Sequence, residues 1–183
     1  MTPINDPHLA LQKKFVEHFA TVDATAQIVL KGHLLIEETL DSILGKFVFH
    51  SAHLESANLR FAQKIDLARS VSLDEHNNEM WELVKAINSL RNELSHSLKS
   101  AKRQQKAQRV IELYLKLLDN AEMSNRHKNE SEEVVLMWAT SFFLGFLSAF
   151  EAEVDRFKSF VNALDRAANP HRQPKTAQPE GDG

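Results

Sequence analysis

Residues 79–98 read EMWELVKAINSLRNELSHSL, and the spacing of the apolar side chains in this stretch predicts the fold class. An apolar residue recurs every three or four positions, which is the period of one face of an α-helix. The stripe consists of Leu83, Ile87, Leu90, Leu94 and Leu98. A helix with such a stripe needs apolar surface from other elements to cover it.

The prolines lie only near the two ends of the chain, at Pro3, Pro7, Pro170, Pro174 and Pro179. Residues 8–169 contain no proline and only three of the five glycines. Because β-rich domains need turn residues of these types, their scarcity favours helices. We therefore expect an all-α fold, an antiparallel bundle of about five to six helices with a long apolar C-terminal helix.

Apolar spacing places the helices along the chain. Ser72 with Glu75 three residues on resembles a capping box that opens the central helix. The expected helices cover about 9–20, 24–49, 57–69, 72–96, 101–123 and 130–168. We expect one domain over 1–168 and a disordered tail over 169–183, which is rich in proline, glycine and charge.

The helix that contains residues 83–94 is predicted to end near residues 97–100. The next apolar stripe, of Ile111, Leu115 and Leu118, would lie about 120° or more away from the first on a continuous helix. Since both stripes should face one core, a break between them is expected. His96 then falls in the last turn of its helix.

Residues 134–150 form an uncharged run of seventeen, VVLMWATSFFLGFLSAF. This length is at the short limit for a membrane span, and Glu132, Glu133, Glu151 and Glu153 flank the run without a basic cluster. A buried helix is therefore expected rather than a membrane span. Its cover would be the rest of the bundle or a second copy of the chain.

Composition is that of an ordinary soluble protein: 183 residues, 43% hydrophobic, 26% charged, with a formal net charge of -3. The absence of cysteine removes disulfides and thiolate metal sites and suits a reducing cytosol. The N-terminus lacks the basic start and apolar run of a signal peptide, so a cytoplasmic location is expected. Neither a metal nor a cofactor is expected.

Arg91, Asn92 and His96 are the strongest candidates for chemistry. Asn92 and His96 lie four residues apart and share a helix face, roughly opposite the apolar stripe, whereas Arg91 lies at the flank of the stripe. Histidine can take and give a proton near neutral pH, and arginine binds phosphate oxygens as a fixed cation. The alternative is an ordinary exposed helix end, because two-residue patterns are common.

The stretch Leu90-Arg91-Asn92-Glu93-Leu94-Ser95-His96 resembles the signature of the HEPN superfamily, in which an arginine is followed after four to six residues by a histidine. A polar residue often follows the arginine, and Asn92 holds that place. Residues 32–40 (GHLLIEETL) and 61–68 (FAQKIDLA) are similar to upstream helices of such domains. The resemblance covers about residues 24–120.

This resemblance implies an all-helical, metal-independent endoribonuclease whose two protomers line one cleft with both motifs. His96 would act as general base or acid at the ribose 2′-hydroxyl, Arg91 would stabilise charge on the phosphate, and Asn92 would orient either. The product would be a 2′,3′-cyclic phosphate. The expected partners are a second copy of the chain, an RNA substrate and an antitoxin protein, in a toxin–antitoxin pair or antiphage defence.

One position departs from the HEPN toxins that are neutralised by nucleotidylation. Those toxins have a tyrosine two residues after the histidine, where this chain has Leu98. An antitoxin would therefore act by binding rather than by modification.

Basic residues follow the motif at spacings that place them on one helix face, where they could follow an RNA backbone despite the negative net charge. They are Lys99, Lys102, Arg103, Lys106 and Arg109. A solvated face that serves only solubility is equally compatible with this pattern. Glu37 and Glu38 are possible accessory carboxylates, although the polar edge of an amphipathic helix explains them more simply.

A non-enzymatic function is the alternative. The mannitol-operon repressor family has a comparable helical layout, and a regulatory or interaction module of that build would use Arg91 and His96 for a salt bridge and a helix cap at a dimer seam.

Overall fold

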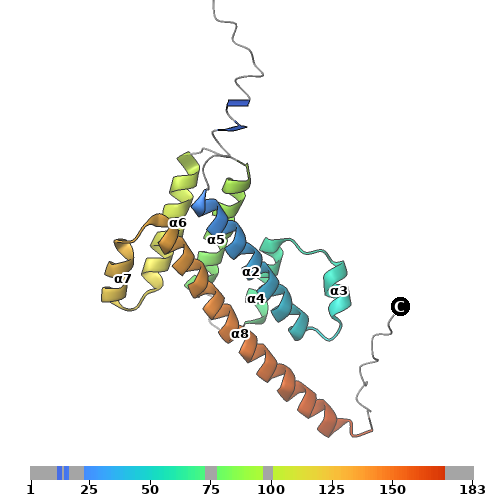
Figure 1. Ribbon diagram of the computed structural model, residues 1–183. Coiled ribbons are helices and arrows are strands. Elements are labelled where there is room, and N and C mark those ends of the chain that lie inside the picture. Colours follow the sequence, from blue (N-terminus) through green and yellow to red (C-terminus); the bar gives the residue numbers. More distant parts are fainter. Residues whose placement is uncertain (1–11, 14, 17–22, 73–77, 97–100, 172–183) are drawn as a thin grey trace, which may run out of the picture. The chain divides into compact units, whose positions relative to one another are not determined.

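The computed structural model describes residues 12–13, 15–16, 23–72, 78–96 and 101–171. Within these residues every regular element is a helix, which confirms the predicted all-α bundle with a long C-terminal helix (Figure 1). The helices are α2 (Ala24–Phe47), α3 (Ser51–Ser56), α4 (Phe61–Val71), α5 (Glu79–His96), α6 (Ala101–Leu117), α7 (Ala121–Lys128) and α8 (Glu132–Ala168).

The described helices differ from the expected ones in number and bounds. A short helix, α3, forms where the sequence reads as a polar break, and the expected helix over 101–123 is two helices, α6 and α7. Asn120 separates them, because its side chain accepts hydrogen bonds from the amides of Glu122 and Met123 and so caps α7. The expected helix over 9–20 and the predicted capping box at 72–75 lie largely outside the described residues.

The chain divides into two compact units. The first comprises residues 1–34 and 82–141, and the second comprises residues 35–81 and 142–183. The prediction of one domain over residues 1–168 and of a tail over 169–183 stays a prediction, since the described residues end at 171.

The first unit is built around α5. The predicted stripe is buried at Leu83, Ile87 and Leu90, whereas Leu94 is half-buried near the end of the helix. In this unit α2 and α8 approach closely at Gly32, where an added Cβ would lie 2.5 Å from Cγ2 of Thr140. Glycine suits this contact because it has no Cβ, whereas any larger residue would collide with the Thr140 side chain.

Aromatic side chains form the core of the second unit. The indole of Trp81 packs edge-on against Phe143, Phe146 and Phe150, with ring centroids 6.2, 5.3 and 6.1 Å away respectively. Such edge-to-face pairs are favourable because the positive ring edge meets the negative ring face. Aliphatic residues of α2 and α4 complete this core: Ile36, Leu40, Ile43, Ile65 and Ala68 are buried.

Helix α8 is the one described helix long and apolar enough to cross a membrane, with a mean hydropathy of 1.6 over its most apolar window. Only 39% of that window is buried. This is weak evidence for a membrane span, because the core helix of a soluble protein meets the same criterion. The expectation that the helix is buried in a soluble protein therefore stays a prediction.

Candidate functional site

The C-terminal turn of α5 carries the predicted motif. The described part of α5 runs to His96, and the next described helix, α6, begins at Ala101. Residues 97–100, and with them Lys99 and Leu98, lie outside the described residues. The predicted break between the two helices falls on these residues, so it stays a prediction.

Asn92 and His96 are both exposed, and one helical turn separates them, so they share a face about 40° wide. Arg91 is half-buried and leaves the helix about 140° from His96. Its guanidinium is nevertheless drawn toward the Asn92 side, because Nη1 donates a hydrogen bond of 3.3 Å to Oδ1 of Asn92. The three residues thus place a cation, an amide and an imidazole on neighbouring surface.

Arg91 has no carboxylate partner among the described residues. The hydroxyl of Ser95 donates to the Arg91 carbonyl one turn earlier over 3.0 Å.

The basic residues of α6 do not form a free cationic face. Arg103 makes a bidentate ion pair with Asp23, with 2.6 Å between Nη2 and Oδ1. Lys106 binds Oε2 of Glu93 at 3.0 Å and the Ser89 carbonyl at 3.3 Å. These two cations are thus already engaged within the first unit.

The pKa values at the Arg103–Asp23 pair follow from this contact. The hydrogen bond from Arg103 holds the pKa of the Asp23 carboxyl below its usual range, and the same bond raises the pKa of Arg103. Lys102 and Arg109 are exposed, and Arg109 lies 4.0 Å from Glu112 one turn on. Of the predicted RNA ligands on α6, these two are the more exposed to solvent.

The two accessory carboxylates belong to the second unit. Glu37 accepts a hydrogen bond of 2.9 Å from Nζ of Lys64, which also binds Asp41 at 2.7 Å. Desolvation by itself would lower the pKa of Lys64, but its bonds to Asp41 and Glu37 outweigh this and raise the pKa. Glu38 is exposed. Glu37 therefore has a structural partner, and a catalytic role for either carboxylate stays a prediction.

No group of three or more histidine, aspartate or glutamate side chains suited to a metal ion occurs among the described residues. This finding does not test the expectation that the protein needs no metal or cofactor, because it describes only how the possible ligand side chains are placed.

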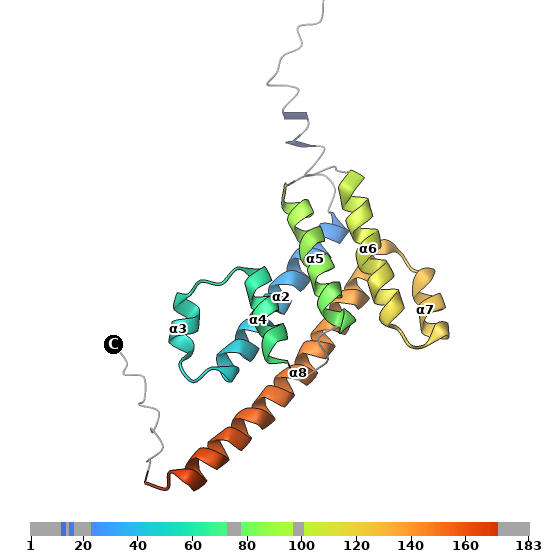
Figure 2. The same cartoon turned by 180° about the vertical axis from the view of Figure 1, so that it is seen from behind.

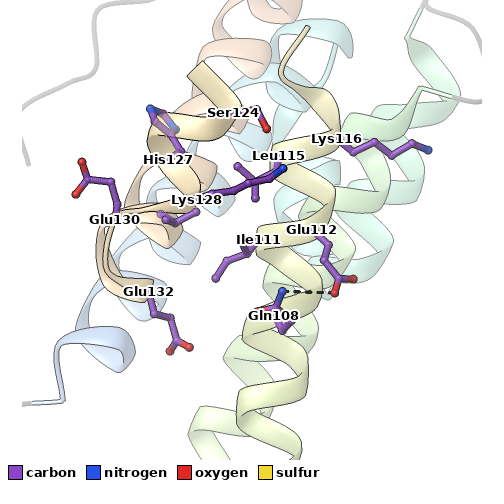
Figure 3. Close-up of a pocket in the computed structure, with 11 residues that line it drawn as sticks. Gln108, Ile111, Glu112, Leu115, Lys116, Ser124, His127, Lys128, Glu130 and Glu132 are labelled. Carbon is purple, nitrogen blue, oxygen red and sulfur yellow. Dashed lines mark hydrogen bonds between the residues drawn. The ribbon is translucent and has the colours of Figure 1, made fainter. Parts of the chain in front are cut away.

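A hollow of about 700 Å³ between α6, α7 and the start of α8 was not predicted from the sequence (Figure 3). Its walls mix apolar Ile111 and Leu115 with charged Glu112, Lys128 and Glu130. Because acidic and basic side chains both line the hollow, it does not favour a ligand of one charge sign. The motif residues of α5 are not part of it.

At the edge of this hollow, His127 is buried and its Nδ1 lies 2.7 Å from Oη of Tyr114. The ring also stacks on Trp138, with centroids 5.6 Å apart. Burial raises the pKa of the Tyr114 phenol. The contact between Tyr114 and His127 holds α7 against α6. The sequence did not indicate this contact, because the two residues are thirteen positions apart and lie on different helices.

Comparison of the chain with models of known families, with curated proteins and with solved structures finds no match.

Proposed function

We propose that the protein is a metal-independent endoribonuclease of HEPN type that acts at the C-terminal end of α5. The observation that carries the proposal is the hydrogen bond from Arg91 to Asn92. It turns a guanidinium that has no carboxylate partner in the described part of the chain toward the surface that Asn92 shares with the exposed His96. A phosphate at this surface would meet a fixed cation, and its ribose would meet a titratable nitrogen.

The chemistry requires only these groups. His96 takes the proton of the ribose 2′-hydroxyl, whose oxygen attacks the adjacent phosphorus. Arg91 stabilises the charge that develops on the phosphoryl oxygens, and Asn92 orients the phosphate or the imidazole. The 5′-oxygen leaves with a proton from a second acid, and the product is a 2′,3′-cyclic phosphate. Since the 2′-hydroxyl is the nucleophile, RNA is cleaved and DNA is not.

The second acid comes from a second copy of the chain in this proposal. Two motifs that line one cleft supply two histidines, of which one acts as base and the other as acid. Lys102 and Arg109, both exposed on α6, hold the flanking RNA backbone. The enzyme is cytoplasmic and serves as the toxin of a toxin–antitoxin pair or in antiphage defence, and an antitoxin neutralises it by binding.

A non-catalytic regulatory module of the mannitol-operon-repressor kind is the second candidate. The ion pairs of Arg103 with Asp23 and of Lys106 with Glu93 favour it, because they commit two of the predicted RNA ligands to the fold. In that case the surface of Arg91, Asn92 and His96 binds a partner protein and does no chemistry.

The test compares wild type, His96→Ala and His53→Ala on a structured RNA in the presence of chelator. His53 is a matched control because it is also an exposed helical histidine but lies on α3, in the other unit. The proposal expects cleavage by wild type and His53→Ala and none by His96→Ala. Equal cleavage by all three would point to a contaminant, and no cleavage by any would favour the regulatory module.

A further inference from the structure

The apolar stripe of α8 continues beyond the part that its own chain covers. In the second unit it follows spacings of four and three over seven positions, which is the heptad pattern of a two-helix seam. The positions are Phe143, Leu147, Phe150, Val154, Phe157, Val161 and Leu164. The first four are buried, whereas Phe157 is 46% exposed, Leu164 is 53% exposed and Val161 is half-buried.

Trp81 of α5 packs on Phe143 and Phe150 in the buried part of the stripe, and α2 runs beside α8 only as far as Phe47. Within the second unit it runs parallel to α8, as the hydrogen bonds of Ser42 to Glu151 at 2.7 Å and of Lys46 to Asp155 at 2.9 Å show. It ends at Phe47, whose ring stacks on Phe157 with centroids 5.9 Å apart. Both views of the structure show α8 continuing past this end (Figures 1 and 2).

We propose that the end of α8, residues 157–168, pairs with the same segment of a second copy in an antiparallel two-helix seam. The orientation follows from α2. A parallel partner helix would have to continue along Val154 and Phe150, which are already buried in their own chain. Trp81 packs on Phe150, and Phe47 and Val71 lie beside both residues. An antiparallel partner enters from the free end of α8 and covers only the segment beyond Phe47.

Side-chain sizes match in this arrangement. With Val161 opposite Leu164 of the second copy, the heptad register sets Phe157 opposite Ala168 and Phe160 opposite Ala167. Each large ring then meets a methyl group, as close packing between two helices requires. The parallel arrangement would instead set Phe157 against its own counterpart.

Charge is also complementary across the antiparallel seam. The register places Lys158 of one copy beside Asp165 of the other, and symmetry produces this contact twice. Asp165 also accepts a hydrogen bond of 2.8 Å from Asn169 of its own chain, so the lysine would join a carboxylate that already has a partner. Lys158 makes no ion pair or hydrogen bond with any described residue of its own chain. It is therefore available to a carboxylate of the second copy.

The area available makes the dimer weak. Phe157, Phe160 and Leu164 are exposed by 46%, 61% and 53%. With roughly 200 Å² for an aromatic side chain, this corresponds to roughly 300 Å² per copy and about 600 Å² in all. Stable interfaces bury at least about 1,200 Å², so the dimer should form and dissociate with concentration. The inference does not rest on the proposed ribonuclease activity.

Sedimentation of the full chain over a range of concentrations tests the proposal, with Leu164→Glu set against Ala163→Glu. Both variants add one charge to an exposed position of α8, but residue 163 lies outside the seam. We expect wild type and Ala163→Glu to dimerise alike and Leu164→Glu to weaken dimerisation by about tenfold or more. A monomer at all concentrations, or equal masses for the two variants, would overturn the proposal. Binding of a monomeric wild type to lipid vesicles would overturn it as well, because the exposed segment would then contact a membrane surface and not a second copy.

Orientation has a separate readout, because the natural chain contains no cysteine. Val161→Cys and Leu164→Cys proteins carrying tags of different length are oxidised alone and as a mixture. The antiparallel seam predicts that the mixed disulfide forms faster than either self-disulfide. Faster self-crosslinking of Leu164→Cys would show a parallel pairing and contradict the register.

Discussion

Replacement of Gly32 by alanine tests the closest helix approach in the first unit. The new Cβ would lie 2.5 Å from Cγ2 of Thr140, below any normal contact. Thr140 cannot easily turn away, because its Oγ1 donates a hydrogen bond of 2.9 Å to the Leu136 carbonyl and β-branched side chains are restricted in helices. Gly45 lies on the same helix with nothing within 4 Å of its Cβ position, which makes Gly45→Ala the matched control.

The magnitudes follow from two opposing effects. Alanine in place of a helical glycine stabilises by about 1 kcal/mol, so Gly45→Ala should raise Tm by roughly 2–4 °C. Gly32→Ala gains the same amount but suffers overpacking of about 1–3 kcal/mol. Its free energy of unfolding should therefore fall about 1–3 kcal/mol below that of Gly45→Ala.

The assay is urea unfolding of both variants and of a double-mutant cycle with Thr140→Ser. Serine removes the clashing methyl group while it keeps the hydroxyl that binds Leu136, so it should recover most of the loss caused by Gly32→Ala. Equal stabilisation by Gly32→Ala and Gly45→Ala, or a coupling energy near zero, would refute the close approach.

Three further predictions concern the ion pair of the first unit and buried groups of both units. Tyr114→Phe should destabilise the protein by about 1–3 kcal/mol in urea unfolding, because it leaves Nδ1 of the buried His127 without its partner; an unchanged midpoint would contradict this. Asp23, whose pKa is lowered by Arg103, stabilises the fold above its unfolded pKa, and this contribution is lost as pH falls through the lower folded pKa. The stability difference between wild type and Asp23→Asn should therefore be present at neutral pH and vanish in strong acid, and a difference independent of pH would count against the pair. Trp81→Ala should cost about 3–5 kcal/mol, measured by thermal unfolding, because the indole fills the aromatic core.

The fold class follows from the sequence because helix periodicity is local. The scarcity of proline and glycine and the stripe from Leu83 to Leu90 predicted helices, and α5 carries this stripe buried in the structure. The break predicted after Leu94 falls on residues 97–100, outside the described residues, and stays a prediction. A helix cap was missed inside a stretch whose apolar spacing favours one continuous helix. Asn120 is a capping residue that splits the expected helix over 101–123, and it is recognisable by the acidic Glu122 that follows.

For the candidate site, the sequence predicted which residues share a face of one helix, but it did not predict contacts between different helices. The shared face of Asn92 and His96 follows from helical spacing alone. The partners of Arg103 and Lys106 do not, because Asp23 lies just before α2 and Glu93 lies on α5, and only tertiary packing brings them near. For the same reason a basic stripe in a sequence overstates the positive charge that the folded surface offers.

Analysis of RNA ends tests the central claim most directly. Wild type, His96→Ala and His53→Ala are incubated with a 5′-labelled structured RNA in chelator, and the new ends are identified. The account predicts 2′,3′-cyclic phosphate ends with wild type and His53→Ala, and intact RNA with His96→Ala. Cleavage that survives in His96→Ala, or 3′-hydroxyl ends, would contradict a ribonuclease that uses this histidine.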